Sequence, residues 1–108
     1  MSQDYLGEFE QMVLLAIMRL GKEAYGLAVK DEMEAVAGRS PSSGALYTTL
    51  DRMERKGLVT STEGPSSSER GGRPRRYLHL TPAGVEMLAR SRSTLLALWN
   101  GLEGALDR

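Results

Sequence analysis

Hydroxyl and guanidinium side chains recur at helical spacing in the segment SSGALYTTLDRMERKG, residues 42–57. Leu46, Leu50 and Met53 recur at intervals of four and three, which places them on one face of a helix predicted over residues 42–56. The remaining faces carry small, hydroxyl and arginine side chains, which hydrogen-bond to phosphates and base edges in nucleic-acid complexes. The segment therefore predicts a helix that buries one face and offers the other to an anionic partner, although a solvated polar face has the same pattern.

The candidate contact residues on this helix form two groups. The residues expected to reach base edges are Thr48, Thr49 and Arg52. The residues expected to contact phosphates are Ser42, Ser43, Tyr47 and Arg55. Ser42 is also the predicted N-cap, and Gly57 is predicted to end the helix in left-handed geometry. Two copies of such a helix in a dimer would read a pseudo-palindromic DNA site.

Two further helices must position this segment. Apolar periodicity predicts one over residues 5–20 and another over residues 24–37, the second with Tyr25, Val29, Met33 and Val36 facing inward. The second helix is joined to the helix at 42–56 by a short turn. Two helices connected in this way, the second with a basic and hydroxylic outer face, are typical of a helix-turn-helix. The first helix is apolar nearly all round, which predicts that it packs against both the core and a second subunit.

After Gly57 the pattern changes to that of a β-hairpin. Strands are predicted at residues 58–62 and 76–80, joined by a loop at 63–75 that is rich in serine, glycine, proline and charge. The arginines of this hairpin are Arg70, Arg73, Arg75 and Arg76. A solvated hairpin tip would have this composition, but beside a helix-turn-helix the cluster favours contact with phosphates or the minor groove.

A long C-terminal helix is predicted from Thr81-Pro82, an N-cap followed by proline at the first helical position, to about Leu106. Its apolar residues alternate at three and four, which is typical of a helix that pairs with another subunit. The predicted interface residues of a homodimer are Phe9, Val13, Val85, Leu88, Leu95, Trp99, Leu102 and Leu106.

Composition narrows the class of protein. The chain has 108 residues, no cysteine and one histidine, His79, so thiolate chemistry and histidine clusters are excluded. We find no Ser/His/Asp set, no metal-ligand spacing and no phosphate-binding glycine loop, and we expect neither an enzyme nor a cofactor. No apolar run reaches membrane-spanning length and no signal region opens the chain, so we expect a cytoplasmic protein.

Charge is unevenly distributed along the chain, although its formal net value is zero. Residues 1–38 contain three basic and seven acidic side chains, whereas residues 39–80 contain eight basic and four acidic ones. A basic middle third indicates a local anionic partner, and double-stranded DNA fits the helix-turn-helix pattern.

Three segments resemble the small members of the PadR family of transcriptional regulators. They are Tyr25-Gly26, SSGALYTTLDRMERKGLV at 42–59, and GRPRRYLHLTPAG at 72–84. Tyr47 matches the tyrosine of the family's recognition helix, and Leu50, Met53, Gly57 and Leu58 match its leucine-rich frame. The sequence departs from the family pattern at Thr48, where proline is frequent, and in its long serine-rich hairpin loop.

The resemblance implies a mainly α fold with a small β wing: a winged helix-turn-helix over residues 1–80 and a C-terminal dimerisation helix over 81–108. It also implies a dimeric repressor, and related members of the family control efflux, detoxification or stress genes. Some small relatives hold planar drugs between paired tryptophans, which suggests a site for an aromatic or lipophilic effector at Trp99, with Leu95, Met12 and Leu15 as wall residues. The alternatives are that Trp99 only fills the interface, and that the chain is a protein-interaction module without specific DNA binding.

Overall fold

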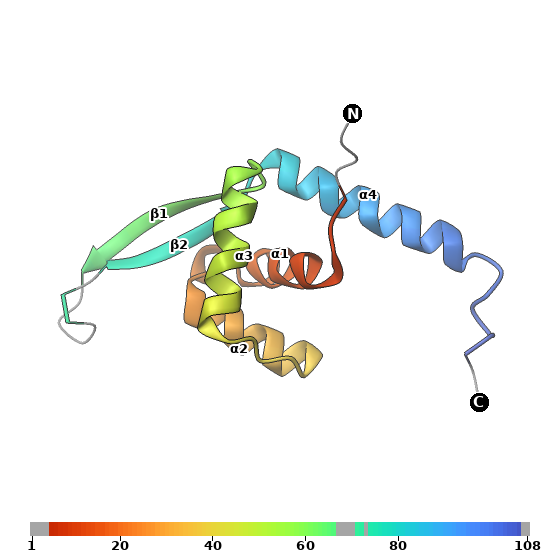
Figure 1. Ribbon diagram of the computed structural model, residues 1–108, viewed down its shortest axis with the longest axis horizontal. Coiled ribbons are helices and arrows are strands. Elements are labelled where there is room, and N and C mark those ends of the chain that lie inside the picture. The colour runs from red at the N-terminus through yellow and green to blue at the C-terminus, as the bar shows by residue number, and fades with distance from the viewer. Residues whose placement is uncertain (1–4, 67–70, 73, 107–108) are drawn as a thin grey trace.

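The protein is described by a computed structural model that covers residues 5–66, 71–72 and 74–106. Its elements are α1 (Glu8–Leu20), the short 3-10 helix η1 (Gly21–Glu23), α2 (Gly26–Ala37), α3 (Ser43–Arg55), β1 (Val59–Ser66), β2 (Pro74–Leu80) and α4 (Pro82–Trp99). Figure 1 shows α1, α2 and α3 gathered at the centre, with the β1–β2 ribbon projecting on one side and α4 extending on the other. This arrangement confirms the predicted mainly helical fold with a two-stranded wing and a C-terminal helix.

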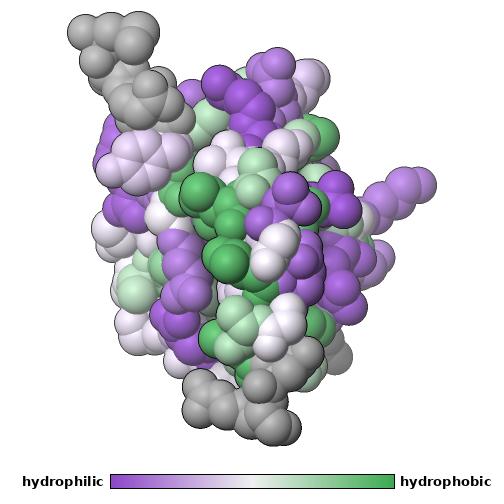
Figure 2. All heavy atoms as spheres, turned by 90° about the vertical axis from the view of Figure 1, so that its right-hand side faces the viewer, coloured by the Kyte–Doolittle hydropathy of each residue, from purple (hydrophilic) through white to green (hydrophobic). Residues whose placement is uncertain are grey.

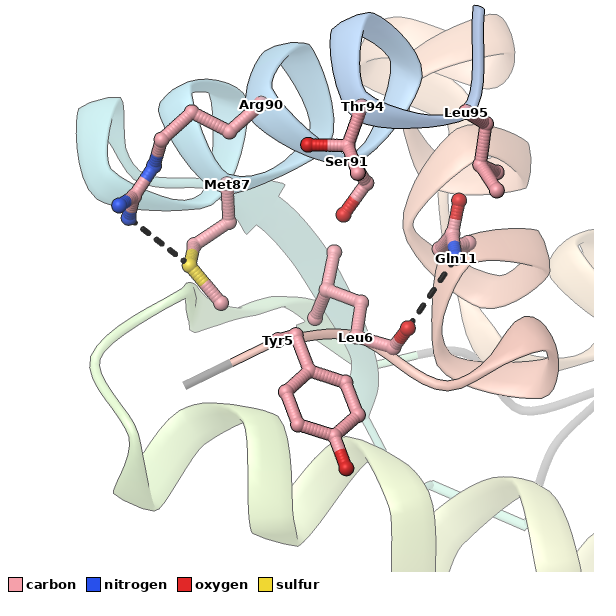
Figure 3. Close-up of a pocket in the computed structure, with 8 residues that line it drawn as sticks. All are labelled: Tyr5, Leu6, Gln11, Met87, Arg90, Ser91, Thr94 and Leu95. Atoms are coloured by element: carbon pink, nitrogen blue, oxygen red, sulfur yellow. Dashed lines mark hydrogen bonds between the residues drawn. The ribbon is translucent and has the colours of Figure 1, made fainter. Parts of the chain in front are cut away.

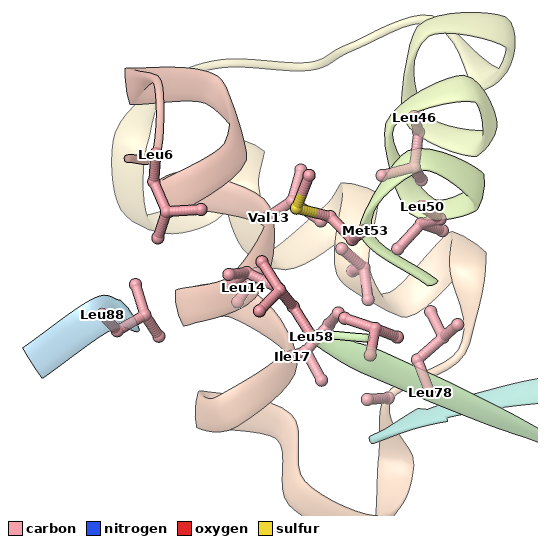
Figure 4. Close-up of a cluster of buried hydrophobic side chains, with 14 of the residues drawn as sticks. Leu6, Val13, Leu14, Ile17, Leu46, Leu50, Met53, Leu58, Leu78 and Leu88 are labelled. Atoms are coloured by element: carbon pink, nitrogen blue, oxygen red, sulfur yellow. The ribbon is translucent and has the colours of Figure 1, made fainter. Parts of the chain in front are cut away.

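The core surrounds α1, which contributes the fully buried side chains of Val13 and Leu14 (Figure 4). Leu46, Leu50 and Met53 of α3 pack into the same cluster, as their spacing predicts, together with Leu58 just before β1, Leu78 of β2 and Leu88 of α4. Val13 and Leu88 were expected at a dimer interface, and this is wrong within this fold. Their side chains are 0% and 7% exposed because the chain's own core encloses them.

The first helix begins at Glu8 and not at residue 5. Residues 5–7 approach the helix as extended chain, and Leu6 is buried in the core. Oε1 of Glu10 accepts a hydrogen bond from the amide of Gly7 at 2.9 Å, and this satisfies a backbone donor at the helix start.

The second helix begins at Gly26, two residues later than predicted. Ala24 and Tyr25 instead extend the wing. The amide of Leu78 donates to the Ala24 carbonyl at 2.7 Å, and Tyr25 forms an antiparallel bridge with Tyr77. Val36 was expected to face inward, but its side chain is 57% exposed, so this expectation is wrong. It lines a shallow hollow between α1 and α2 that no other described element covers.

The third helix has the predicted ends. Oγ of Ser42 accepts from the amide of Ala45 at 3.1 Å, which confirms the N-cap. Gly57 has φ of +78°, which is the left-handed conformation expected after the helix. The chain then turns directly into the wing, because the amide of Leu58 donates to the carbonyl of Met53 at 3.0 Å.

Both wing strands are longer than predicted. β1 and β2 pair antiparallel from Val59 with Leu80 to Glu63 with Arg76, and the register shifts before Ser66 pairs with Pro74. The pairing therefore continues into the segment that was expected to be a loop from residue 63.

The last helix starts as predicted and ends early. Oγ1 of Thr81 accepts from the amide of Gly84 at 3.0 Å and donates to the carbonyl of Gly57 at 2.7 Å, which joins the start of α4 to the end of α3. The helix was expected to continue to about residue 106, but it ends at Trp99. Gly101 has φ of +87°, which is incompatible with helix, and Leu102 lies in the turns that follow.

Candidate nucleic-acid interface

The outer face of α3 is largely exposed. Tyr47, Thr48 and Arg55 are exposed, as are Ser42 and Ser43 at the helix start. Thr49 differs, because it is only 4% exposed and lies on the core side beside Leu50. The expectation that Thr49 meets a base edge is therefore wrong in this conformation.

Arg52 lies at the edge of this face and is paired with α1. Its Nε donates to Oε2 of Glu10 at 3.0 Å, and its Nη2 donates to Oγ1 of Thr49 at 3.5 Å. Nζ of Lys56 lies 3.8 Å from the same Glu10 oxygen. Partial burial raises the pKa of Glu10, but the Gly7 amide, Arg52 and Lys56 together lower it further, so the net pKa lies below its ordinary value. Glu10 is therefore an anion at neutral pH.

Arg76 of β2 connects the wing to α3. Its guanidinium pairs with Glu54 and lies 3.4 Å from Oδ1 of Asp51. Oε2 of Glu54 also accepts from the Ser61 hydroxyl at 2.9 Å, so one α3 carboxylate contacts both strands. This arrangement holds the wing at a defined angle beside the outer face of α3. Arg76, expected to meet DNA, is thus engaged within the chain.

Arg75 has a different environment. Its guanidinium lies over the ring of Tyr25, 4.0 Å from the centroid, and Tyr25 meets Tyr77 edge to face with centroids 5.8 Å apart. A hydrogen bond to Tyr77 raises the pKa of Arg75 above its ordinary value, as does the nearby Glu23. These contacts orient a half-buried cation at the junction of the wing and the helices.

The same junction forms a hollow of about 490 Å³ between the start of α2, α3 and β2. Its lining residues are Tyr25, Gly26, Leu27, Tyr47, Pro74, Arg75 and Arg76. Tyr25 was expected to face the core, and neither Tyr77 nor Glu10 was among the predicted site residues. The bridge between Tyr25 and Tyr77 of β2 brings the Tyr25 side chain to this hollow. No local sequence pattern indicates that bridge. Arg70 and Arg73, also expected to meet DNA, lie outside the described residues.

The residues expected to form an effector site do not meet within one chain. Leu95 lines a hollow of about 310 Å³ between the N-terminal segment, α1 and α4, together with Tyr5, Met87 and Thr94 (Figure 3). Met12 and Leu15 line a separate hollow of about 300 Å³ between α1 and α2. Trp99 is the last residue of α4 and is 42% exposed. An effector site built from all four residues would require a second subunit.

Residues 5–66, 71–72 and 74–106 contain no group of three histidine or carboxylate side chains placed to hold a metal ion. Within the same residues, no helix combines the length and apolar character needed to cross a membrane.

A helix-turn-helix made by α2 and α3, followed by a two-stranded wing beside the exposed face of α3, defines a winged helix-turn-helix DNA-binding protein. The family model of the "Transcriptional regulator PadR-like family" matches residues 14–90. The chain belongs to this family of transcriptional regulators, which confirms the resemblance noted in the sequence.

Solved structures agree with this assignment. A PadR-like transcriptional regulator from Bacillus cereus is 25% identical, with a TM-score of 0.72 over 93% of this chain and 92% of that one. A PadR family regulator from Eggerthella lenta is 27% identical, with a TM-score of 0.68 over 93% and 87%. A putative transcriptional regulator from Thermoplasma acidophilum, 21% identical with a TM-score of 0.69 over 90% and 91%, shares the fold. No curated protein sequence matches the chain.

Proposed function

We propose that this regulator is a homodimeric repressor that reads a pseudo-palindromic operator with its two copies of α3. The observation that carries the proposal is the exposed outer face of α3, with Tyr47, Thr48 and Arg55 accessible and the wing fixed beside it by the Arg76–Glu54 pair. A helix with such a face enters the major groove while the wing follows the adjacent backbone.

The contacts divide by chemistry. We assign Thr48 and Arg52 to base edges, and Ser42, Ser43, Tyr47 and Arg55 to phosphates. Arg75 is the phosphate contact of the wing, because it is a half-buried cation that lies over the Tyr25 ring and has no carboxylate partner among the described residues. Arg76 holds the wing beside α3 through its pairs with Glu54 and Asp51, and it contributes less to DNA affinity than Arg75.

A dimer is supported by apolar side chains that one chain leaves exposed. Val85, Leu95 and Trp99 of α4 are 46%, 48% and 42% exposed, although side chains of this size are usually buried. Leu102 and Leu106 follow in the turns beyond α4 and are also exposed. Figure 2 shows hydrophobic side chains gathered on the face at the α4 end of the molecule. We therefore propose that residues 1–80 bind DNA. The partner subunit is contacted by residues 81–108 and by Phe9 on α1.

A salt titration on duplex DNA tests the proposal. Affinity for the upstream region of the chain's own gene should exceed that for random duplex by at least about a thousandfold. Both affinities should fall steeply between low and moderate salt, because cations that contact phosphates release counterions. A footprint should show two half-sites about 10 base pairs apart, or a multiple of that spacing. Absence of duplex binding at low salt would overturn this function and leave the protein-interaction module as the better explanation.

We further propose that an aromatic or lipophilic effector binds at Trp99 in the dimer. Support comes from its exposed indole and from its place at the end of α4, where a two-fold axis would bring two copies together. Planar cationic dyes should quench tryptophan fluorescence and weaken operator binding. If the fluorescence ignores a broad panel of such dyes, Trp99 fills the interface and senses nothing of this chemical class.

A further inference from the structure

The guanidinium group of Arg52 is held along one edge only. Nε bonds to Glu10, and Nη2 bonds to Thr49. These two donors point the same way and form one side of the planar group. In the described part of the chain, the opposite end, formed by Nη1 and the outer N–H of Nη2, has no hydrogen-bond partner. That end carries the pair of parallel donors used in bidentate contacts.

The carboxylate that holds Arg52 is itself fixed. The Glu10 side chain is only 13% exposed, whereas the Arg52 side chain is 40% exposed. Oε1 of Glu10 accepts from the Gly7 amide, so the two oxygens of the carboxylate face different partners. Glu10 lies one turn before Val13 and Leu14, which are completely buried, and this anchors its backbone in the core. The acid is therefore a rigid support, and the arginine is the accessible partner.

We propose that Glu10, assisted by Thr49, is a positioning residue that orients Arg52 to read a guanine in the operator. Bidentate recognition of the O6 and N7 atoms of guanine needs two parallel donors at a fixed angle. An arginine held by its other edge meets that requirement without losing rotamer freedom when DNA binds. This inference rests on the proposed function, because it assigns a partner to one residue of that DNA-binding face.

Two other roles for Glu10 lead to different results. If Glu10 only competed with DNA phosphates for Arg52 and Lys56, its removal would strengthen binding to every sequence. If Glu10 only joined α1 to α3, its removal would lower stability and weaken binding to every sequence equally. A positioning residue instead affects discrimination at one base pair of each half-site.

The experiment compares Glu10→Gln with Glu32→Gln in the full chain. Glu32 is a matched control because its Oε2 accepts from Nε of Arg19 at 2.8 Å, on the surface between α1 and α2. Each variant loses one negative charge and one carboxylate–arginine pair. Binding is measured to the footprinted operator, to operators with each base pair replaced in turn, and to random duplex.

With Glu10→Gln, discrimination at a single G·C pair per half-site should fall by about 5- to 150-fold, the range that a bidentate contact supplies. Affinity for random duplex should stay the same or rise, and Glu32→Gln should behave as wild type throughout. Arg52→Ala should lose discrimination at the same base pair, and adding Glu10→Gln to it should change nothing more. Thr49→Val removes the second hydrogen-bond acceptor of Arg52 and keeps a side chain of similar volume. It should reduce discrimination at the same base pair to a smaller extent.

Unchanged discrimination in Glu10→Gln, or an equal change on all DNA, overturns the positioning role. If wild type discriminates among operators and Arg52→Ala reduces this, while neither Glu10→Gln nor Thr49→Val does, the inference fails and the proposed function stands. If wild type shows no preference for any duplex, the proposed function itself fails.

Discussion

The hydroxyl of Tyr47 on α3 lies directly against the backbone of Gly26 at the start of α2, in the space that a side chain at residue 26 would fill. Gly26 is buried, whereas Tyr47 is 41% exposed. The absence of a side chain at residue 26 therefore sets the direction in which this tyrosine points from the outer face of α3.

Gly26→Ala should displace the Tyr47 ring into solvent and weaken DNA binding by about tenfold or more, since the hydrogen bond proposed between its hydroxyl and a phosphate is lost. Stability should change little, because the ring tip is free to move outward. Adding Gly26→Ala to Tyr47→Ala should have no further effect on affinity if the glycine acts through the tyrosine. Binding and thermal unfolding are measured on all three variants, and an additive loss in the double variant would contradict this explanation.

Arg75→Ala and Arg76→Ala should differ although the two residues are adjacent. Arg75 lies over the Tyr25 ring and pairs with no carboxylate in the described residues, so its loss should reduce the slope of log affinity against log salt by about one unit. Arg76 is paired with Glu54 and Asp51, so its loss should leave the slope nearly unchanged. Arg76→Ala should also lower the free energy of unfolding by about 0.2–1 kcal/mol, the usual range for partly exposed ion pairs. Equal slopes for both variants would mean that Arg76 leaves its carboxylates when DNA binds.

Leu95 and Leu88 on α4 provide a contrast between interface and core. Leu95 is 48% exposed in one chain, so changing Leu95 and the exposed Leu102 together to Asp should leave a folded monomer. Leu88 is 7% exposed, and Leu88→Asp should unfold the chain because it places a charge in the core. Circular dichroism reports folding and sedimentation reports mass. A folded dimer from the Leu95 and Leu102 double variant would exclude α4 as the interface.

The Glu10–Arg52 pair should make stability depend on pH in the acid range. The folded-state pKa of Glu10 lies below the ordinary value of 4.5. Stabilisation by the carboxylate is therefore complete above that value and is lost as pH falls through the folded-state pKa. Urea unfolding of wild type and Glu10→Gln should differ by about 1 kcal/mol at pH 7 and converge well below pH 4.5. A difference that persists unchanged in strong acid would show that packing, and not charge, is responsible.

Local patterns in the sequence were sufficient for both ends of α3, for the start of α4 and for the buried stripe of α3, whereas the starts of α1 and α2 and the end of α4 differ from the prediction. The Ser42 and Thr81 caps and the left-handed Gly57 lie where their residue types predict, because capping depends on atoms within one turn of the chain. Alternation and turn residues likewise predict the wing, and together these features define the winged helix-turn-helix class.

The environment of each functional side chain depended on contacts between distant segments. Glu10 and Arg52 are 42 residues apart, and Arg76 and Glu54 are 22 apart, so no local pattern relates them. Two of the predicted DNA contacts, Arg52 and Arg76, are oriented by these carboxylates, and a third, Thr49, is buried by its position on α3. Periodicity describes one helix at a time, whereas the partner of a charged group is decided by the way in which α1, α3 and the wing pack together.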